Sequence, residues 1–149
     1  MVIRKPGRRP RRGTVAVETA LVMVAVTSLL FGVFEFSRLF MDWNLLNNAA
    51  REGCRFAIVN NTDAAITTEV QTTVTTYMAG QTTSFSNFAV TVSGTHLGVA
   101  TPVNNLTAGD LVTVSVSGKY KFMNIIPFVK MPASFTITSS VIMGCEGGL

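Results

Sequence analysis

The sequence predicts an α+β fold with a long N-terminal helix, a second short helix and a roughly three-stranded antiparallel sheet packed on the long helix. Three patterns support this prediction: an apolar run that continues as an amphipathic helix, a second helical repeat, and three later stretches of period-two alternation. The 149 residues suffice for one modest domain. We expect a basic segment over residues 1–13, a transmembrane helix over 14–34 and an α+β domain over 35–149.

Residues 14–34 form an apolar segment whose only charged side chain is Glu18. As a helix it would be about 31 Å long, close to the hydrocarbon thickness of a bilayer. A signal peptide is the alternative, but the residues after Phe34 read Glu-Phe-Ser-Arg, which does not resemble the small-residue cleavage site of such peptides. The segment therefore predicts a membrane anchor.

Six of the twelve Lys and Arg residues lie before Gly13: Arg4, Lys5, Arg8, Arg9, Arg11 and Arg12. Basic flanks stay on the cytoplasmic side of a membrane helix, which predicts a cytoplasmic N-terminus and a domain on the far side. A basic run can also bind nucleic acid, but no aromatic residue interleaves these arginines and no recognition helix follows. We expect no nucleic-acid partner.

The helix is expected to continue past the membrane to Val59, as one helix of about 45 residues. Apolar or small residues recur every three or four positions at Phe36, Leu39, Phe40, Trp43, Leu46, Ala50, Cys54 and Ala57. Trp43 is expected to pack on the domain. The opposite face is expected to carry Arg38, Asp42, Asn48, Arg51, Glu52 and Arg55, with pairing distances between Glu35 and Arg38 and between Arg38 and Asp42.

A second helix is expected over residues 64–79, with Asp63 as its N-cap and Gly80 as its terminator. Its apolar stripe would comprise Ile66, Val70, Val74, Tyr77 and Met78. Three strands follow, and their inward faces would carry Phe88, Val90 and Val92; then Val112, Val114, Val116, Tyr120 and Phe122; then Phe135, Ile137, Val141 and Met143. Gly118 on the inward face suggests a close approach or a bulge. The oily connector 124–132 is expected to lie against the core, and residues 95–109 to form a polar connection.

Known catalytic patterns are absent from the sequence. There is no Ser/His/Asp set, no HExxH motif and no phosphate-binding loop, and the one histidine, His96, lies in a polar stretch. No CxxC or other metal-ligand cluster occurs, so we expect no enzyme, no metal and no cofactor.

Glu18 is the unusual residue of the apolar segment, because a carboxylate at the hydrocarbon edge costs about 2–3 kcal/mol. If the chain were cut after Gly13, Thr14 would gain a free α-amine one helical turn from Glu18. The amine of one copy could also meet Glu18 of a neighbour and fix the stagger between subunits. The alternative is an acid that reaches the lipid headgroups and has no such role.

This region resembles the type IV pilin superfamily, and more closely the TadE-like pseudopilins of the tight-adherence (Flp) pilus. The matching blocks lie in order at compatible spacing: Arg11-Arg12-Gly13, Ala16-Val17-Glu18, Ala20-Leu21, Glu35-Phe36-Ser37-Arg38, and Asn44 through Ala49-Ala50-Arg51-Glu52-Gly53-Cys54-Arg55. The resemblance covers roughly residues 11–59 and implies a pilin-like fold. It implies cleavage between Gly13 and Thr14 and a role in assembly for Glu18.

By this resemblance the chain would be a minor pilin of the bacterial inner membrane. Its partners would be a prepilin peptidase, other pilins or pseudopilins and the pilus assembly platform. The alternative is an uncut single-pass envelope protein with an extracytoplasmic binding module. Outside the cytoplasm, Cys54 and Cys145 could form a disulfide that closes a loop of about 90 residues; otherwise they are two buried or reactive thiols.

Overall fold

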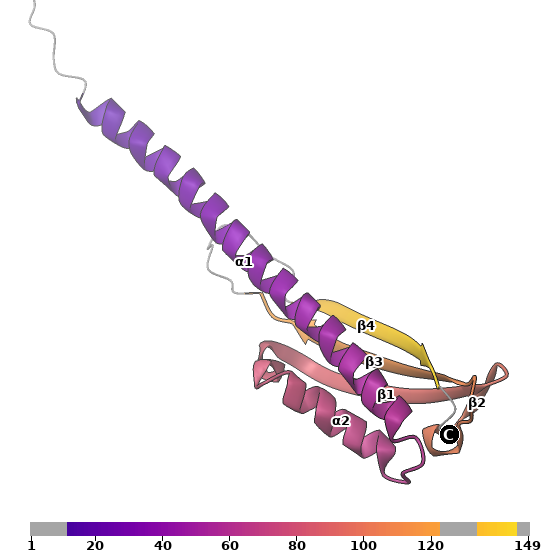
Figure 1. The fold of residues 1–149 in the computed structure, drawn as a ribbon. Helices are drawn as coiled ribbons and strands as arrows, with labels where there is room; N and C mark the ends of the chain where they lie inside the picture. The colour runs from indigo at the N-terminus through magenta and orange to yellow at the C-terminus, as the bar shows by residue number, and fades with distance from the viewer. Residues whose placement is uncertain (1–11, 123–133, 146–149) are drawn as a thin grey trace, which may run out of the picture.

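The computed structural model describes residues 12–122 and 134–145. Their order is α1 (Arg12–Val59), α2 (Ile66–Tyr77), a 3-10 turn η1 (Gln81–Ser84), β1 (Phe85–His96), β2 (Val99–Thr101), a second 3-10 turn η2 (Val103–Asn105), β3 (Leu111–Tyr120) and β4 (Phe135–Gly144). The predicted α+β class is confirmed (Figure 1). The basic segment before Arg12 and the connector 124–132 lie outside the described residues.

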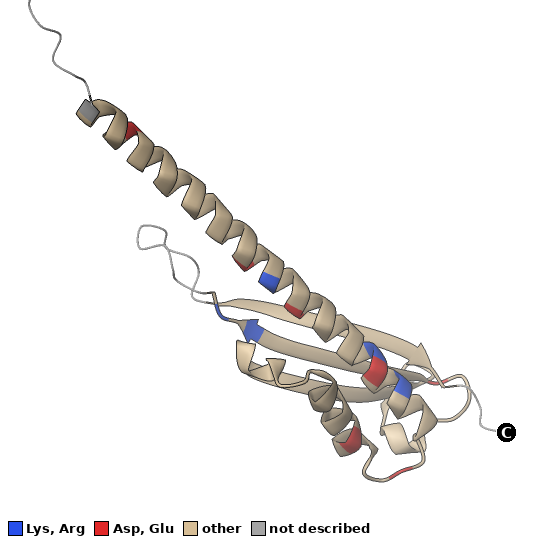
Figure 2. Ribbon diagram, turned by 60° about the vertical axis from the view of Figure 1, so that its left-hand side comes forward, with Lys and Arg blue, Asp and Glu red and all other residues tan. Residues whose placement is uncertain are grey.

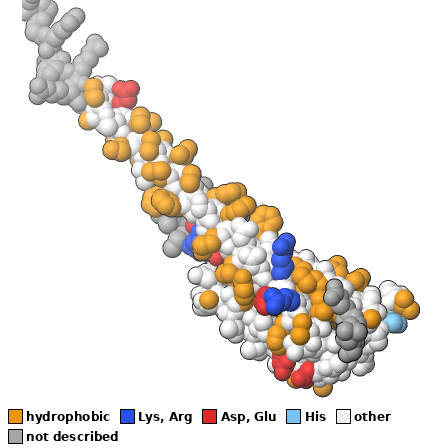
Figure 3. Space-filling model, in the orientation of Figure 1, with side chains coloured by type: hydrophobic (Ala, Val, Ile, Leu, Met, Phe, Trp, Pro, Cys, Tyr) orange, Lys and Arg blue, Asp and Glu red, His pale blue; other side chains and the backbone are white. Residues whose placement is uncertain are grey.

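The long helix α1 has a free half and a packed half, and the predicted helix to Val59 is confirmed. Its N-terminal half projects away from the domain, while its C-terminal half lies across the sheet beside α2 (Figure 1). Apolar side chains cover the projecting half in the space-filling view (Figure 3). Because water would not tolerate so much exposed apolar surface, this half needs lipid or other helices around it.

The sheet has four antiparallel strands in the order β2-β1-β3-β4, so the expected three strands were one too few. The missed strand β2 is three residues long and pairs with the end of β1 through a two-residue turn at Leu97 and Gly98. Both turn residues have positive φ, +50° and +84°, as a type I′ hairpin requires. A strand of three residues is too short to show period-two alternation. β2 lies within residues 95–109, which were expected to form a polar connection.

The core lies between the inner sheet face and the two helices. Leu46, Ala50, Cys54 and Ala57 of the predicted α1 stripe are fully buried, as are Val112, Val114, Val116 and Tyr120 of β3. Tyr77 was expected in the α2 stripe but is 44% exposed. The buried positions advance by four residues, from Ile66 through Val70 and Val74 to Met78, and Tyr77 lies about 100° around the helix from that line.

Gly118 allows a close approach, as predicted. The group that approaches it is an aromatic ring, whereas a helix or a bulge in β3 was expected. A Cβ at Gly118 would lie 2.8 Å from the Phe85 ring. The irregularity is in β1 instead, where the register shifts between Ser86 and Ala89 and Asn87 has φ of +56°. This bulge places both Phe85 and Phe88 on the inner side, with ring centroids 6.4 Å apart.

The start of α2 also differs from the prediction. Asp63 accepts a 2.8 Å hydrogen bond from the Ala65 N–H, so its carboxylate stabilises the turn before the helix, while Ala65 is the N-cap residue. Gly80, with φ of +85°, follows the end of α2 as expected and precedes η1.

Candidate functional site

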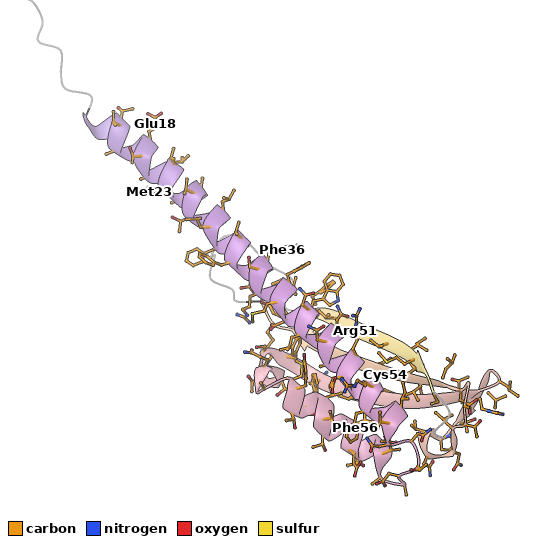
Figure 4. All side chains as sticks on the ribbon, viewed as in Figure 1. Glu18, Met23, Phe36, Arg51, Cys54 and Phe56 are labelled. Atoms are coloured by element: carbon orange, nitrogen blue, oxygen red, sulfur yellow. The ribbon has the colours of Figure 1, made fainter. Side chains whose placement is uncertain are left out.

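The N-terminal end of α1 brings together the residues of the predicted cleavage and assembly site. Gly13, Thr14 and Glu18 are all exposed and line one shallow hollow with Val17, Leu21 and Val22. Thr14 and Glu18 are one helical turn apart on the same side. The Glu18 side chain points outward near the free end of the helix (Figure 4).

Three hydroxyl groups along α1 are paired with the backbone of the helix itself. The hydroxyls of Thr19, Ser28 and Ser37 each donate a 2.8 Å hydrogen bond to the carbonyl four residues earlier. No charged residue follows Glu18 until Glu35, and Figure 2 shows the gap between them. Glu18 is therefore the one ionisable side chain that the apolar half of α1 exposes to its surroundings.

A second polar cluster lies where α1 meets the sheet. The Tyr120 hydroxyl donates a 3.0 Å hydrogen bond to Oε1 of Glu35. The Arg38 guanidinium lies over the same ring, 5.1 Å from its centroid, and donates a 3.4 Å hydrogen bond to the Lys121 carbonyl. Glu35 and Arg38, singled out by the Glu-Phe-Ser-Arg motif, thus connect the helix to the end of β3.

This geometry corrects the expected polar face of α1. Arg38 contacts the domain, and Asp42 is 1% exposed instead of solvated. Asp42 lies one turn before the fully buried Leu46, so the two side chains share the inward face of α1. The apolar stripe alone did not reveal how far the sheet covers that face.

Asp42 is a buried carboxylate without a hydrogen-bond partner at either oxygen among the described residues. Burial raises its pKa, and the positive charge of Arg38 opposes part of that shift. A neutral, protonated Asp42 is favoured by this environment. Sequence reasoning missed this residue, because the helical period places Asp42 on the same face as Leu46 but does not show that the domain extends over it.

The remaining motif residues of α1 divide into surface and packing roles. Arg51 and Arg55 are exposed, and Arg55 Nη1 lies 3.9 Å from Glu52 Oε2 in a surface ion pair of little energetic weight. Gly53 between them is buried against α2, and a Cβ there would lie 2.5 Å from Cγ2 of Val74. The Arg-Glu-Gly-Cys-Arg block is thus a helix-packing element with a charged outer face, and Figure 2 shows the charged residues near the C-terminal end of α1.

Both cysteines are free and buried in the structure. The Cys54 thiol lies 3.4 Å from the Val112 carbonyl, and Cys145 follows β4. Burial raises the pKa of both thiols, and the proximity of Cys145 adds to the shift at Cys54. The disulfide stays a prediction, and the two residues do lie in the same region of the core.

His96 lies at the end of β1, farthest from the free end of α1, and it pairs with Asp110. Its Nδ1 is 2.6 Å from Oδ1 of Asp110, whose other oxygen accepts hydrogen bonds from the backbone N–H and hydroxyl of Thr107. The Thr107 N–H bond, followed by the His96 contact, lowers the pKa of Asp110 despite its burial. The described residues contain no group of three or more His, Cys, Asp or Glu placed to hold a metal.

An apolar groove lies between α1 and β4, with a volume of about 420 Å³. It is lined by Phe36, Leu39, Phe40 and Trp43 of the helix and by residues 135–138 of the strand. Trp43 was expected to pack on the domain; it borders this groove and is 47% exposed.

α1 is long and apolar enough to cross a membrane, with a mean hydropathy of 2.1 over its most apolar 18-residue window. This helix thus has the length and composition of a single-pass membrane anchor, and it continues into the domain. Residues 13–55 match the family of TadE-like proteins, which confirms the resemblance found in the sequence and connects the chain with the tight-adherence pilus system. Neither the curated proteins nor the solved structures gave a match.

Proposed function

We propose that this protein is a minor pilin, or pseudopilin, which acts in the assembly of a tight-adherence pilus and has no enzymatic activity. Its leader would be cut between Gly13 and Thr14 by a prepilin peptidase. The observation that carries the proposal is the position of Glu18, exposed one turn after Thr14 on an otherwise uncharged apolar half-helix.

The electrostatics explain why cleavage and assembly would be linked. An ionised carboxylate at the hydrocarbon edge is costly unless a cation meets it. Cleavage creates such a cation, the α-amine of Thr14, which is protonated at neutral pH. If the amine of one subunit meets Glu18 of its neighbour, the contact offsets this cost and sets the axial offset between the two helices.

The proposed orientation follows from the basic segment. The five arginines and one lysine before Gly13 would keep the N-terminus in the cytoplasm, where the peptidase site would lie at the inner-membrane surface. The domain would then lie on the far side, with its Glu35–Arg38 junction just outside the lipid. Partners would be the peptidase, other pilin-type subunits and the assembly platform.

The test is N-terminal sequencing of the full-length protein co-expressed with a tight-adherence prepilin peptidase. We expect a chain that begins at Thr14, and cutting that is lost in Gly13→Ala. A chain that keeps its leader beside an active peptidase would contradict the proposal and favour an uncut, anchored envelope protein.

The assembly role of Glu18 needs a separate variant. Glu18→Gln removes the charge at nearly constant size, so we expect insertion and cutting at normal levels with loss of pili by electron microscopy. Glu52→Gln, an exposed-face acid in the same helix, is the matched control and should leave piliation intact. Normal pili in Glu18→Gln would remove this residue from the mechanism.

A further inference from the structure

The outer edge of β4 is a long strand edge that nothing among the described residues covers. β4 is last in the order β2-β1-β3-β4, and its ten residues, Phe135–Gly144, contain neither a charge nor a proline. Proteins usually protect such edges with lysine, proline or a bulge, because unpaired backbone groups recruit another strand. Here those protections are absent over the full length of β4.

The hydrogen-bond pattern identifies which backbone groups of β4 point away from β3. The Cys145 N–H donates to the Asp110 carbonyl and its carbonyl accepts from the Gly109 N–H, so Cys145 is directed toward the β3 side. Directions alternate along an antiparallel strand, so the odd-numbered residues of β4 pair with β3. The outward N–H and C=O groups therefore belong to residues 136, 138, 140, 142 and 144.

Alongside this edge, α1 presents apolar side chains that extend past the sheet. Phe36, Phe40 and Trp43 are 66%, 51% and 47% exposed, and they line the groove of about 420 Å³ together with the start of β4. A fifth strand beside β4 would lie under these side chains and would cover the groove with every second side chain.

We propose that the β4 edge and this groove bind an extended, uncharged segment of another pilin-type subunit, which adds to the sheet as a fifth strand. The proposal rests on the proposed function, because it names the partner of the assembling subunit. The backbone groups that point away from β3 match the hydrogen-bond pattern of an added strand, and the uncharged edge and apolar groove match alternating apolar residues directed toward α1.

Membrane anchoring argues against antiparallel pairing of two copies through their β4 edges. This strand runs alongside α1 in the same direction, away from the projecting half (Figures 1 and 2). Antiparallel pairing of two β4 edges would point the two anchor helices in opposite directions, which one membrane does not allow. A different strand of a different subunit has no such restriction.

The test uses full-length protein co-expressed with candidate pilin-type subunits of the same system and purified in detergent. Thr138→Pro removes one outward N–H without touching the β3 ladder, and Thr138→Ala keeps that N–H as the matched control. We expect Thr138→Pro to lower the recovered partner at least about tenfold, equivalent to 1.4 kcal/mol, and Thr138→Ala to leave it unchanged.

Amide exchange supplies a second readout, and a groove variant with a control outside the groove supplies a third. In the complex, the amides of residues 136, 138, 140 and 142 should become protected, while those of 137, 139 and 141 are protected in the isolated protein too. Phe40→Ser should weaken the complex, and Leu97→Ser, at a side chain 90% exposed on the distal hairpin, should not.

Three outcomes would overturn the inference. They are equal partner recovery with Thr138→Pro, protection of the even-numbered amides in the isolated monomer, and the same protection in a homodimer. The second would place residues of the same chain on the edge, and the third would place a second copy there. Leader cutting is scored in the same cells, so failure of the proposed function is seen separately from failure of strand addition.

Discussion

The hydroxyl of Tyr120 donates a 3.0 Å hydrogen bond to the carboxylate of Glu35, which joins the end of β3 to the helix just beyond its apolar half. The Tyr120 side chain is fully buried, and the guanidinium of Arg38 lies over its ring. The contact fixes how the domain sits on its anchor. In the proposed pilin it would also set the height of the domain above the membrane surface.

Loss of this hydrogen bond should weaken the domain. Tyr120→Phe keeps the ring and removes the hydroxyl, and we expect the free energy of unfolding to fall by about 1–3 kcal/mol. Urea unfolding of the detergent-solubilised protein measures the change. Tyr77→Phe, at an exposed position of α2, is the control and should have no effect. Equal stability of the two variants would show that the Glu35 contact is energetically neutral.

Alkaline pH should release the same junction. Burial raises the pKa of Tyr120 to about 12, and the hydrogen bond to Glu35 adds to the shift. Because the folded-state pKa lies above the ordinary value of 10.0, the stabilisation is complete below pH 10 and is lost as pH rises toward 12. Absorbance titration of tyrosinate in Tyr77→Phe isolates Tyr120. A midpoint at the ordinary tyrosine value would contradict the buried contact.

Asp42 should make the domain more stable in acid. Its pKa is raised, so the folded state binds a proton more tightly than the unfolded state, and the stabilisation is lost as pH rises through the folded pKa. Asp42→Asn should abolish this part of the pH dependence and should be at least as stable as the parent at neutral pH. Thermal melts across pH 4 to 8, a range set around ordinary carboxyl pKa values, measure the difference.

Asp110 provides a control of opposite sign for that experiment. Its pKa is lowered, chiefly by the Thr107 N–H, so its contribution is present above the ordinary carboxyl pKa and is lost as pH falls. Asp110→Asn should therefore weaken the protein at neutral pH and flatten its acid sensitivity. If both variants shift in the same direction, the assigned environment of Asp42 is wrong.

Gly53 should tolerate no side chain. A Cβ would lie 2.5 Å from Cγ2 of Val74, so Gly53→Ala must push α2 away from α1, at a cost of about 1–3 kcal/mol. Gly32→Ala, in the same helix with no atom within 4 Å of the added methyl group, is the matched control. Urea unfolding of both variants measures the cost. Wild-type stability in Gly53→Ala would mean that the two helices pack less closely than described.

The two cysteines should be protected from alkylating reagents in the folded, reduced protein. Both are buried, and burial raises the pKa of each thiol, which lowers the fraction of reactive thiolate. Mass analysis should show two alkylations only after unfolding. For protein recovered from outside the cytoplasm, the predicted disulfide should require reductant as well. Two free thiols in that sample without reductant would exclude the disulfide.

Local sequence patterns were sufficient to predict those elements whose apolar periodicity extends over many residues. The apolar run with Glu18, the stripe that continues to Ala57, and the alternation of Val112, Val114 and Val116 each extend over several turns or pleats, and the structure contains them. The motif blocks of α1 pointed to the TadE-like family, which the family match over residues 13–55 confirms.

Tertiary structure decided which polar residues lie inside. Glu35, Arg38 and Asp42 face the domain because the end of β3 covers that part of α1, a contact between residues about 80 positions apart that no helical period encodes. The same is true of the close approach at Gly53 and of the short strand β2. Periodicity reports how one element divides apolar from polar residues, whereas burial of a particular side chain depends on the element that happens to pack against it.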